Sequence, residues 1–230
     1  MQTTSIPASP AEITSAWLTE SLRGSGAIAK SNVRSFTPRI IGEGAGFMGQ
    51  LAQLSLEYDD PEVGAPGSVV AKLPAAAQEN REIAQFFRFY EREVRFYEEI
   101  ADTIELRTPR CYLSHFDPTT GNYVLLLEDL APARVGDQLE GCPVKLAEIA
   151  IAELAKFHAA WWEDARLEKL DWMPSIDAGW YKEAVQDGYL KAWVPFAEFF
   201  GNKLTPELRD ICERYGKHVP EIMDAFGQKP

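Results

Sequence analysis

The hydrophobic pattern of the chain changes its period once, near residue 130. Before that point five short segments alternate apolar and polar residues or form brief apolar runs, which predicts β-strands. Beyond residue 144 apolar residues recur every three or four positions, which predicts helices. The chain is therefore expected to fold as an α+β protein, with an antiparallel β-sheet lobe followed by a helical part. The predicted strands are Val33–Ile41, Gln50–Tyr58, Ser68–Leu73, Arg110–Phe116 and Tyr123–Glu128.

Helices are also predicted around the strands. Ser9-Pro10-Ala11-Glu12 resembles a capping box and predicts a helix over residues 10–23. One long helix is predicted over residues 79–101, between the third and fourth strands. We predict a first lobe over residues 1–130, a linker over 131–143 and a partial helical lobe over 144–230. Its helices are expected at 144–166, at 178–200 with an interruption at Pro195, and from a Thr205 cap to about Gly227.

Composition excludes several classes of protein. The formal net charge of −12 argues against a nucleic-acid partner, because phosphate backbones require a basic surface. No apolar run approaches the roughly 20 residues of a membrane span, and the first residues lack the pattern of a signal peptide. The three cysteines, Cys111, Cys142 and Cys212, are widely spaced, which is typical of a reduced cytoplasmic protein without a disulfide framework or zinc site.

A glycine run separates the first two predicted strands. Gly44, Gly46 and Gly49 fit the pattern GxGxxG. A dinucleotide-binding fold would continue from this run into a helix, whereas Gln50–Tyr58 alternates as a strand. A strand–glycine loop–strand hairpin is the arrangement in which kinases cover nucleotide phosphates. A plain glycine-containing hairpin remains an equally good interpretation at this stage.

Two charged residues lie where apolar residues are expected. Lys72 is inside the short apolar strand Ser68–Leu73, and Glu93 falls within a helical stripe three residues after Tyr90 and four before Tyr97. A carboxylate buried without a partner would cost several kcal/mol, so Lys72 is the expected partner of Glu93. Such a strand-lysine and helix-glutamate pair positions the kinase lysine on the α- and β-phosphates. The alternative is a glutamate at the edge of a broad aromatic face, with its carboxylate in water.

The strand Tyr123–Glu128 ends where the composition changes from sheet to helix. In kinases the segment at this place holds adenine through backbone groups. By analogy, the C=O of Glu128 and the N–H of Leu130 are predicted to frame the base. The alternative is a simple edge strand.

Taken together, these motifs resemble the aminoglycoside phosphotransferase and choline kinase-like superfamily, and within it the ecdysteroid-kinase-like (CHK-like) branch. The resemblance implies a protein-kinase-like fold, ATP and Mg²⁺ as cofactors, and transfer of the γ-phosphate to the hydroxyl of a small molecule. The runs that carry it are Gly42–Gly49, Val70-Ala71-Lys72, Glu93–Tyr97, Leu125–Leu130 and Leu154–Trp162.

The chain departs from the family in its catalytic loop. Such kinases use an HxDxxxxN loop and a second, metal-binding Asp. The single matching run, His115–Asn122, precedes the adenine segment and has hairpin-turn composition, while His158 is interpreted as a hydrogen-bonded structural residue. We therefore expect no catalytic or metal-binding residue here, a chain truncated before that loop, and no activity of this chain alone.

Two other interpretations remain open. One is a degenerate kinase that binds nucleotide or another ligand without catalysis, and the other is a helical interaction protein whose first half is kinase-like by coincidence. In a truncated lobe, two aromatic clusters are expected to be partly exposed. They are Trp161 with Trp162, and Trp193 with Phe196, Phe199 and Phe200.

Overall fold

The computed structural model describes residues 6–42, 48–134, 136–137 and 140–228. The chain divides into two compact units, residues 1–164 and 165–230. Each is described by itself. Among the described residues no helix is both long and apolar enough to cross a membrane.

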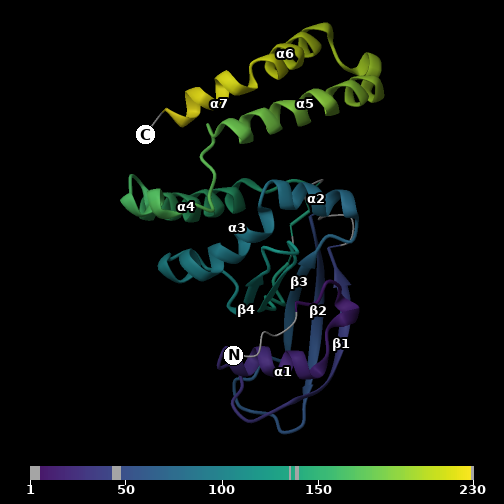
Figure 1. Cartoon of the computed structure of the whole chain (residues 1–230), viewed down its shortest axis with the longest axis vertical. Coiled ribbons are helices and arrows are strands. Elements are labelled where there is room, and N and C mark those ends of the chain that lie inside the picture. The colour runs from purple at the N-terminus through teal and green to yellow at the C-terminus, as the bar shows by residue number, and fades with distance from the viewer. Residues whose placement is uncertain (1–5, 43–47, 135, 138–139, 229–230) are drawn as a thin grey trace. The chain divides into compact units, whose positions relative to one another are not determined.

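A five-stranded antiparallel sheet forms the centre of the first unit (Figure 1). Its spatial order is β1-β2-β3-β5-β4, so β5, the last strand in the chain, lies between β3 and β4. All five predicted strands are confirmed, with ends that differ by at most one residue. The strands are β1 (Val33–Ile41), β2 (Gly49–Tyr58), β3 (Ser68–Pro74), β4 (Cys111–Phe116) and β5 (Tyr123–Glu128).

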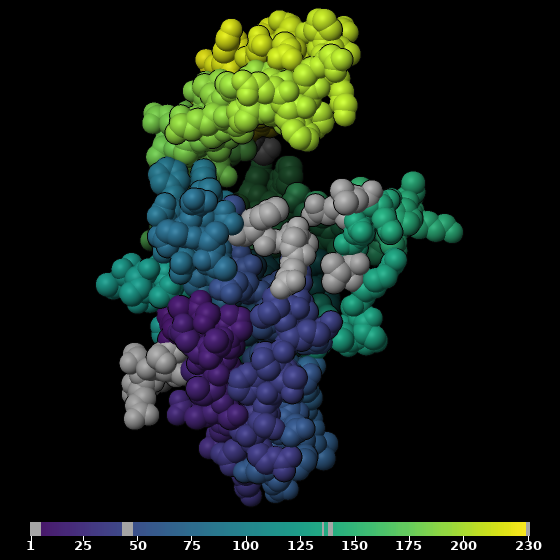
Figure 2. All heavy atoms as spheres, turned by 90° about the vertical axis from the view of Figure 1, so that its right-hand side faces the viewer, coloured from purple at the N-terminus to yellow at the C-terminus, as the bar shows by residue number. Residues whose placement is uncertain are grey.

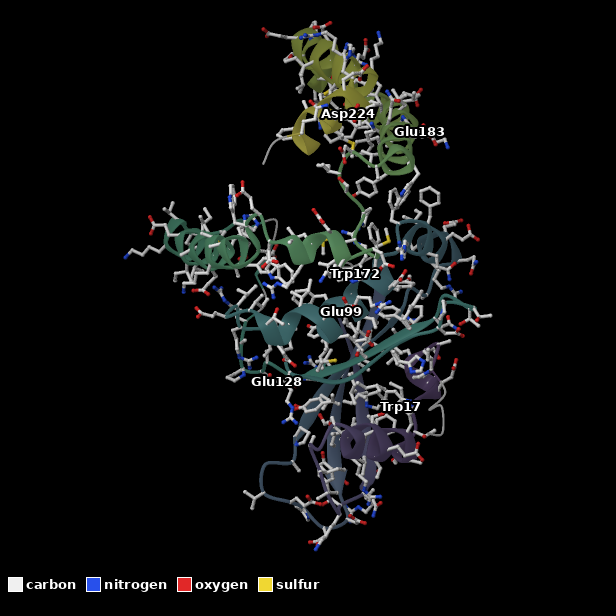
Figure 3. All side chains as sticks on the ribbon, turned by 60° about the vertical axis from the view of Figure 1, so that its left-hand side comes forward. Trp17, Glu99, Glu128, Trp172, Glu183 and Asp224 are labelled. Atoms are coloured by element: carbon white, nitrogen blue, oxygen red, sulfur yellow. The ribbon has the colours of Figure 1, made fainter. Side chains whose placement is uncertain are left out.

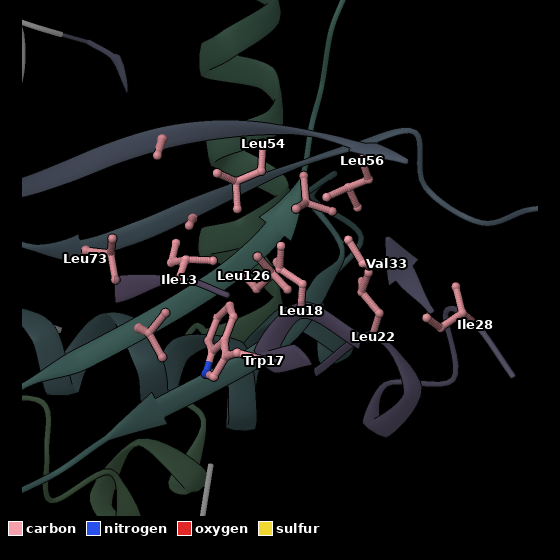
Figure 4. Close-up of a cluster of buried hydrophobic side chains, with 14 residues drawn as sticks. Ile13, Trp17, Leu18, Leu22, Ile28, Val33, Leu54, Leu56, Leu73 and Leu126 are labelled. Carbon is pink, nitrogen blue, oxygen red and sulfur yellow. The ribbon is translucent and has the colours of Figure 1, made fainter. Parts of the chain in front are cut away.

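One face of the sheet packs on helix α1 (Ser15–Gly24). Trp17, Leu18 and Leu22 of α1 are buried against alternate residues of β2, β3 and β5, as the close-up in Figure 4 shows. In the space-filling view of Figure 2, α1 is drawn in purple beside the blue residues of the first strands. Burying side chains of this size contributes roughly 1.5–3 kcal/mol each, so the α1 contact is a main source of stability for the unit.

The start of α1 corrects the predicted cap. Residues Pro10–Glu12 form only a 3-10 turn (η1), after which the extended backbone of Ile13 places its side chain in the core. The helix begins after Thr14, whose hydroxyl accepts the Trp17 N–H at 3.1 Å. The predicted helix over residues 10–23 is therefore two elements, because burial of Ile13 interrupts it.

The opposite face is covered by the segment predicted as one helix over residues 79–101, and that prediction is wrong. The helix α2 (Gln78–Phe86) ends before Arg88, whose φ of 56° is left-handed, and α3 (Phe89–Arg95) starts directly after it. A π-helical turn, η2 (Phe96–Ile100), and a 3-10 turn, η3 (Ala101–Thr103), complete the segment.

The break divides the apolar stripe that suggested a single helix. Ile83 and Phe86 on α2 are 44% and 57% exposed, whereas Tyr90 and Ile100 beyond the break are 2% and 3% exposed. Burial of Tyr90 and Ile100 favours the turn at Arg88. The Arg88 guanidinium is also paired with the Glu91 carboxylate at 2.8 Å.

The helix α4 (Val144–Trp161) has no buried residue. Its predicted end at residue 166 is five residues too late, since Trp162 is already extended. The expected exposure of the first aromatic cluster is confirmed at Trp162, which is 65% exposed.

The second unit is helical, as predicted. It contains η4 (Ala165–Lys169), α5 (Gly179–Phe200), η5 (Gly201–Lys203), α6 (Pro206–Lys217) and α7 (Val219–Gly227). The expected interruption at Pro195 is wrong because α5 continues through it, and the single helix expected after Thr205 is divided at His218.

Side chains hold the helices of the second unit together. The Thr205 hydroxyl caps α6 by accepting the Leu208 N–H at 3.2 Å, as predicted. The Lys182 ammonium on α5 is paired with Asp224 on α7, labelled in Figure 3. The second aromatic cluster is exposed as expected at Phe199, by 83%.

Candidate functional site

Lys72 and Glu93 form an ion pair in the first unit. Alternation along β3 places Ala71 and Leu73 in the core on the α1 side and directs Lys72 to the other face, where α3 carries Glu93. Lys72 Nζ lies 2.6 Å from Glu93 Oε1, and the two side chains are 29% and 31% exposed. The predicted pairing is confirmed, and the alternative of a glutamate pointing only into water is wrong.

Gly49 brings the end of the glycine run to this pair. A Cβ atom built on Gly49 would lie 3.5 Å from Lys72 Cε, 3.1 Å from the Leu73 carbonyl oxygen and 3.0 Å from the Tyr123 hydroxyl oxygen. Glycine is favoured here because a Cβ atom would approach the Leu73 carbonyl and the Tyr123 hydroxyl more closely than usual. The other two glycines of the pattern, Gly44 and Gly46, lie outside the described residues.

Tyr123 belongs to the same site and was missed by sequence reasoning. Its side chain is fully buried, and its ring stacks on Tyr90 with centroids 4.2 Å apart and planes 14° apart. The Tyr90 hydroxyl in turn accepts the Ala75 N–H at 3.0 Å. Burial, together with the negative charge of Glu93, raises the pKa of Tyr123 far above its ordinary value, so the phenol stays protonated. The available signal was one tyrosine at the start of an otherwise aliphatic strand.

Tyr97, on η2, is partly buried against the core on the same side of the sheet. Burial raises the pKa of Tyr97 to about 12, and the charge of Glu93 adds to that shift. A partly dehydrated setting strengthens the attraction between Lys72 and Glu93 relative to water.

The predicted adenine segment follows β5, and its side chains are held from several directions. The Glu128 carboxylate, labelled in Figure 3, accepts the Arg110 N–H at 2.9 Å and two bonds from the Arg107 guanidinium at 2.8 Å. These contacts lower the pKa of Glu128. The carbonyl of Leu130 accepts the Ala133 N–H at 2.8 Å. The edge-strand alternative is wrong, because β5 pairs on both sides, with β3 and with β4.

The HxDxxxxN run forms the turn between β4 and β5. The Asp117 carboxylate accepts the Thr119 N–H at 2.8 Å and the Thr120 hydroxyl at 2.7 Å, and these bonds lower the pKa of Asp117. The Asp117 N–H donates to the Asn122 carbonyl at 2.8 Å, which closes the hairpin. The predicted turn is confirmed, and the Asp117 side chain has a structural role within it.

Among the described residues, His158 and the acidic side chains do not form a second catalytic or metal-binding site. His158 is exposed on α4, with its ring centroid 6.2 Å from that of Phe157, and forms no hydrogen bond to another described residue, so its interpretation as a hydrogen-bonded structural histidine is not supported. Among residues that the structure describes, no three His, Cys, Asp or Glu side chains are grouped so that they could hold a metal ion.

The fold and the ion pair define the class of protein. A five-stranded antiparallel sheet that pairs a strand lysine with a helix glutamate, followed by a helical region, is a kinase-like arrangement. The sequence profile of the ecdysteroid kinase-like family matches residues 43–229, and the chain belongs to that family. It is therefore a kinase-like phosphotransferase by family, and the predicted α+β class is confirmed. A search of curated proteins finds no match.

Proposed function

We propose that this chain contains the ATP-binding part of a phosphotransferase that acts on the hydroxyl group of a small molecule. The observation that carries the proposal is the Lys72–Glu93 pair at 2.6 Å beside Gly49. In kinases a lysine oriented in this way contacts the α- and β-phosphates of the nucleotide. Membership of the ecdysteroid kinase-like family supports the same reaction class.

Each predicted residue has a role in this proposal. Gly44, Gly46 and Gly49 cover the phosphates, and the space that a Cβ atom would fill at Gly49 leaves Lys72 accessible from that side. Glu93 orients Lys72. The C=O of Glu128 and the N–H of Leu130 frame adenine, at the end of a strand whose position is fixed by neighbours on both sides.

Among the described residues no three His, Cys, Asp or Glu side chains are grouped so that they could hold Mg²⁺ without the nucleotide. Mg²⁺ is commonly bound by one or two carboxylates together with substrate phosphates, and it would accompany ATP as the nucleotide complex.

The occupied carboxylate of Asp117 favours a chain that binds nucleotide without transferring phosphate. A catalytic-loop Asp must accept a proton from the substrate hydroxyl, whereas Asp117 is engaged by Thr119 and Thr120 within a tight turn. We therefore propose that these 230 residues bind Mg-ATP and do not turn it over alone. A degenerate nucleotide-binding module is the second candidate function supported by the same observation.

The partners follow from charge and chemistry. We propose a small-molecule acceptor and exclude nucleic acid on the basis of the net charge of −12. Three free cysteines support a reducing, cytoplasmic setting.

Thermal unfolding in the presence of Mg-ATP tests the proposal. At 100 times its dissociation constant, a ligand stabilises the folded state by about 2.7 kcal/mol, which raises Tm by roughly 5–10 °C for a chain of this size. We expect this rise for the wild type and little rise for Lys72→Ala. Lys156→Ala is the control, because Lys156 forms an exposed pair with Glu153 on α4 and should respond like the wild type.

Two results would contradict the proposal in different ways. The absence of any nucleotide response by the wild type would favour the helical interaction protein. ADP release with a panel of hydroxyl acceptors, abolished by Asp117→Ala, would show that the hairpin Asp is catalytic.

A further inference from the structure

The Tyr123 hydroxyl is a buried polar group to which the proposed nucleotide site assigns no role. Tyr123 is fully buried, and within the described residues its hydroxyl oxygen has no hydrogen-bond partner. Leaving a buried donor unpaired costs free energy, and phenylalanine would fill the same ring volume without that cost. An unpaired hydroxyl in this position therefore indicates an acceptor that is present in another state of the site.

The position of the hydroxyl is fixed by its neighbours. The Tyr123 ring is stacked on Tyr90, and the Tyr90 hydroxyl is bonded to the Ala75 N–H at 3.0 Å, so the aromatic pair is tied to the end of β3. The hydroxyl cannot reach a distant acceptor by rotation of the buried ring. Its acceptor must come to it.

The groups beside the hydroxyl are those of the proposed phosphate site. The Gly49 Cβ position lies 3.0 Å from the Tyr123 hydroxyl oxygen and 3.5 Å from Lys72 Cε, which places both around the same glycine. Glu93 lies three residues after Tyr90 on α3, and the Tyr90 ring stacks on Tyr123, so the carboxylate and the phenol are on the same face of the sheet. Burial, together with the charge of Glu93, raises the pKa of Tyr123, so the phenol keeps a proton that it can donate. One oxygen of that carboxylate, Oε1, is bonded to Lys72 Nζ at 2.6 Å.

We propose that Tyr123 is a positioning residue for Glu93 in the nucleotide-bound state. When the phosphates draw Lys72 Nζ toward them, the Tyr123 hydroxyl donates a hydrogen bond to the Glu93 carboxylate and keeps it facing the lysine. This inference rests on the proposed nucleotide binding at Lys72 and adds a residue to it. The bond replaces attraction that Glu93 loses as Lys72 turns to the phosphates. It also satisfies a hydroxyl for which the described residues provide no partner.

The test compares Tyr123→Phe with Tyr58→Phe in the full 230-residue chain, with Mg-ATP as the probe, because the Tyr58 hydroxyl donates to the Pro66 carbonyl at 2.8 Å and has no part in the proposed site. For Tyr123→Phe we expect an unchanged or higher Tm without nucleotide and about tenfold weaker Mg-ATP binding, the range of a hydrogen bond to a charged group. For Tyr58→Phe we expect the reverse, a lower Tm from loss of the bond to the Pro66 carbonyl and Mg-ATP affinity within about twofold of the wild type. A purely structural role of Tyr123 would instead lower Tm and affinity together.

Repeating the Tyr123→Phe change in a Glu93→Ala variant identifies the hydrogen-bond acceptor of the Tyr123 hydroxyl. In Glu93→Ala the Tyr123→Phe change should no longer affect Mg-ATP affinity, because the acceptor is gone. An unchanged affinity of Tyr123→Phe, or the same tenfold loss in the Glu93→Ala background, would overturn the inference while leaving nucleotide binding intact. Absence of Mg-ATP binding by the wild type would instead overturn the proposed function, and the inference with it.

Discussion

Removing either charge of the Lys72–Glu93 pair is expected to destabilise the first unit, and removing both should cost less than the sum. The variants are Lys72→Met, Glu93→Gln and the double variant, which together form a thermodynamic cycle. Methionine and glutamine retain most of the side-chain volume, so the cycle reports the charge interaction.

The magnitude follows from distance and exposure. Two unit charges at the observed 2.6 Å attract by about 1.6 kcal/mol even at the dielectric constant of water. Side chains that are 29% and 31% exposed experience a stronger attraction than this, offset by partial dehydration. We therefore expect a coupling energy of about 1.5 kcal/mol, above the roughly 0.2–1 kcal/mol measured for exposed pairs.

The assay must measure the free energy of unfolding of the sheet rather than that of the second unit. Hydrogen exchange measured along a urea titration, and read on peptides from β3 and β5, gives the free energy of unfolding of the sheet for each of the four proteins. Added salt should reduce the coupling only slightly, because a partly buried pair is screened less than an exposed one.

An exposed pair in the same sheet provides the control. Arg34 and Glu57 lie 3.1 Å apart on β1 and β2, with side chains 68% and 64% exposed. Their cycle, Arg34→Met with Glu57→Gln, should give a much smaller coupling that salt abolishes. Equal coupling in the two cycles would refute the argument that burial makes the Lys72–Glu93 pair the stronger one.

Two further predictions follow from shifted pKa values. Hydrogen bonds from the backbone N–H groups of residues 29–31 lower the pKa of Glu62 from 4.5 to about 2, so the stability that Glu62 contributes is present above pH 4.5 and is lost as the pH falls through about 2. The urea midpoint of unfolding, measured between pH 2 and 6, should fall less steeply with decreasing pH for Glu62→Gln than for the wild type. The neighbouring control Asp60→Asn should follow the wild type. Identical curves for all three proteins would contradict the assignment. Burial raises the pKa of Cys111 to about 11, so alkylation at pH 8, followed by mass spectrometry, should label exposed Cys142 at least about a hundredfold faster. Similar rates at both thiols would show that Cys111 is not held as the neutral thiol.

The parts of the fold that were predicted correctly depend on local patterns. Period-two alternation specified β2, whose Ala52, Leu54 and Leu56 are in the core, and short apolar runs specified β3 and β5, which lie inside the sheet. The pairing of Lys72 with Glu93 was predictable for a related reason, since a charge inside an apolar pattern requires a partner.

The parts that were missed depend on contacts between distant segments. Nothing local distinguishes Ile83 and Phe86 from Tyr90, yet only Tyr90 meets the sheet, and the helix breaks at a non-glycine residue, Arg88. The cap moved from Ser9 to Thr14 for the same kind of reason, because Ile13 is buried against strands far along the chain. The buried hydroxyl of Tyr123, which has no partner among the described residues, likewise becomes visible only when Tyr123 is placed beside Gly49.

The position of β5 constrains how chains of this family can change in length. Val124 and Leu126 belong to the core on the α1 side, while Leu125 and Leu127 belong to the core on the α3 side. One inserted or deleted residue within β5 would exchange these two sets and move the end of the strand relative to Lys72. The connection over residues 59–67 does not contribute side chains to both cores, so we expect insertions to be tolerated there. Insertions within residues 123–128 should be removed by selection.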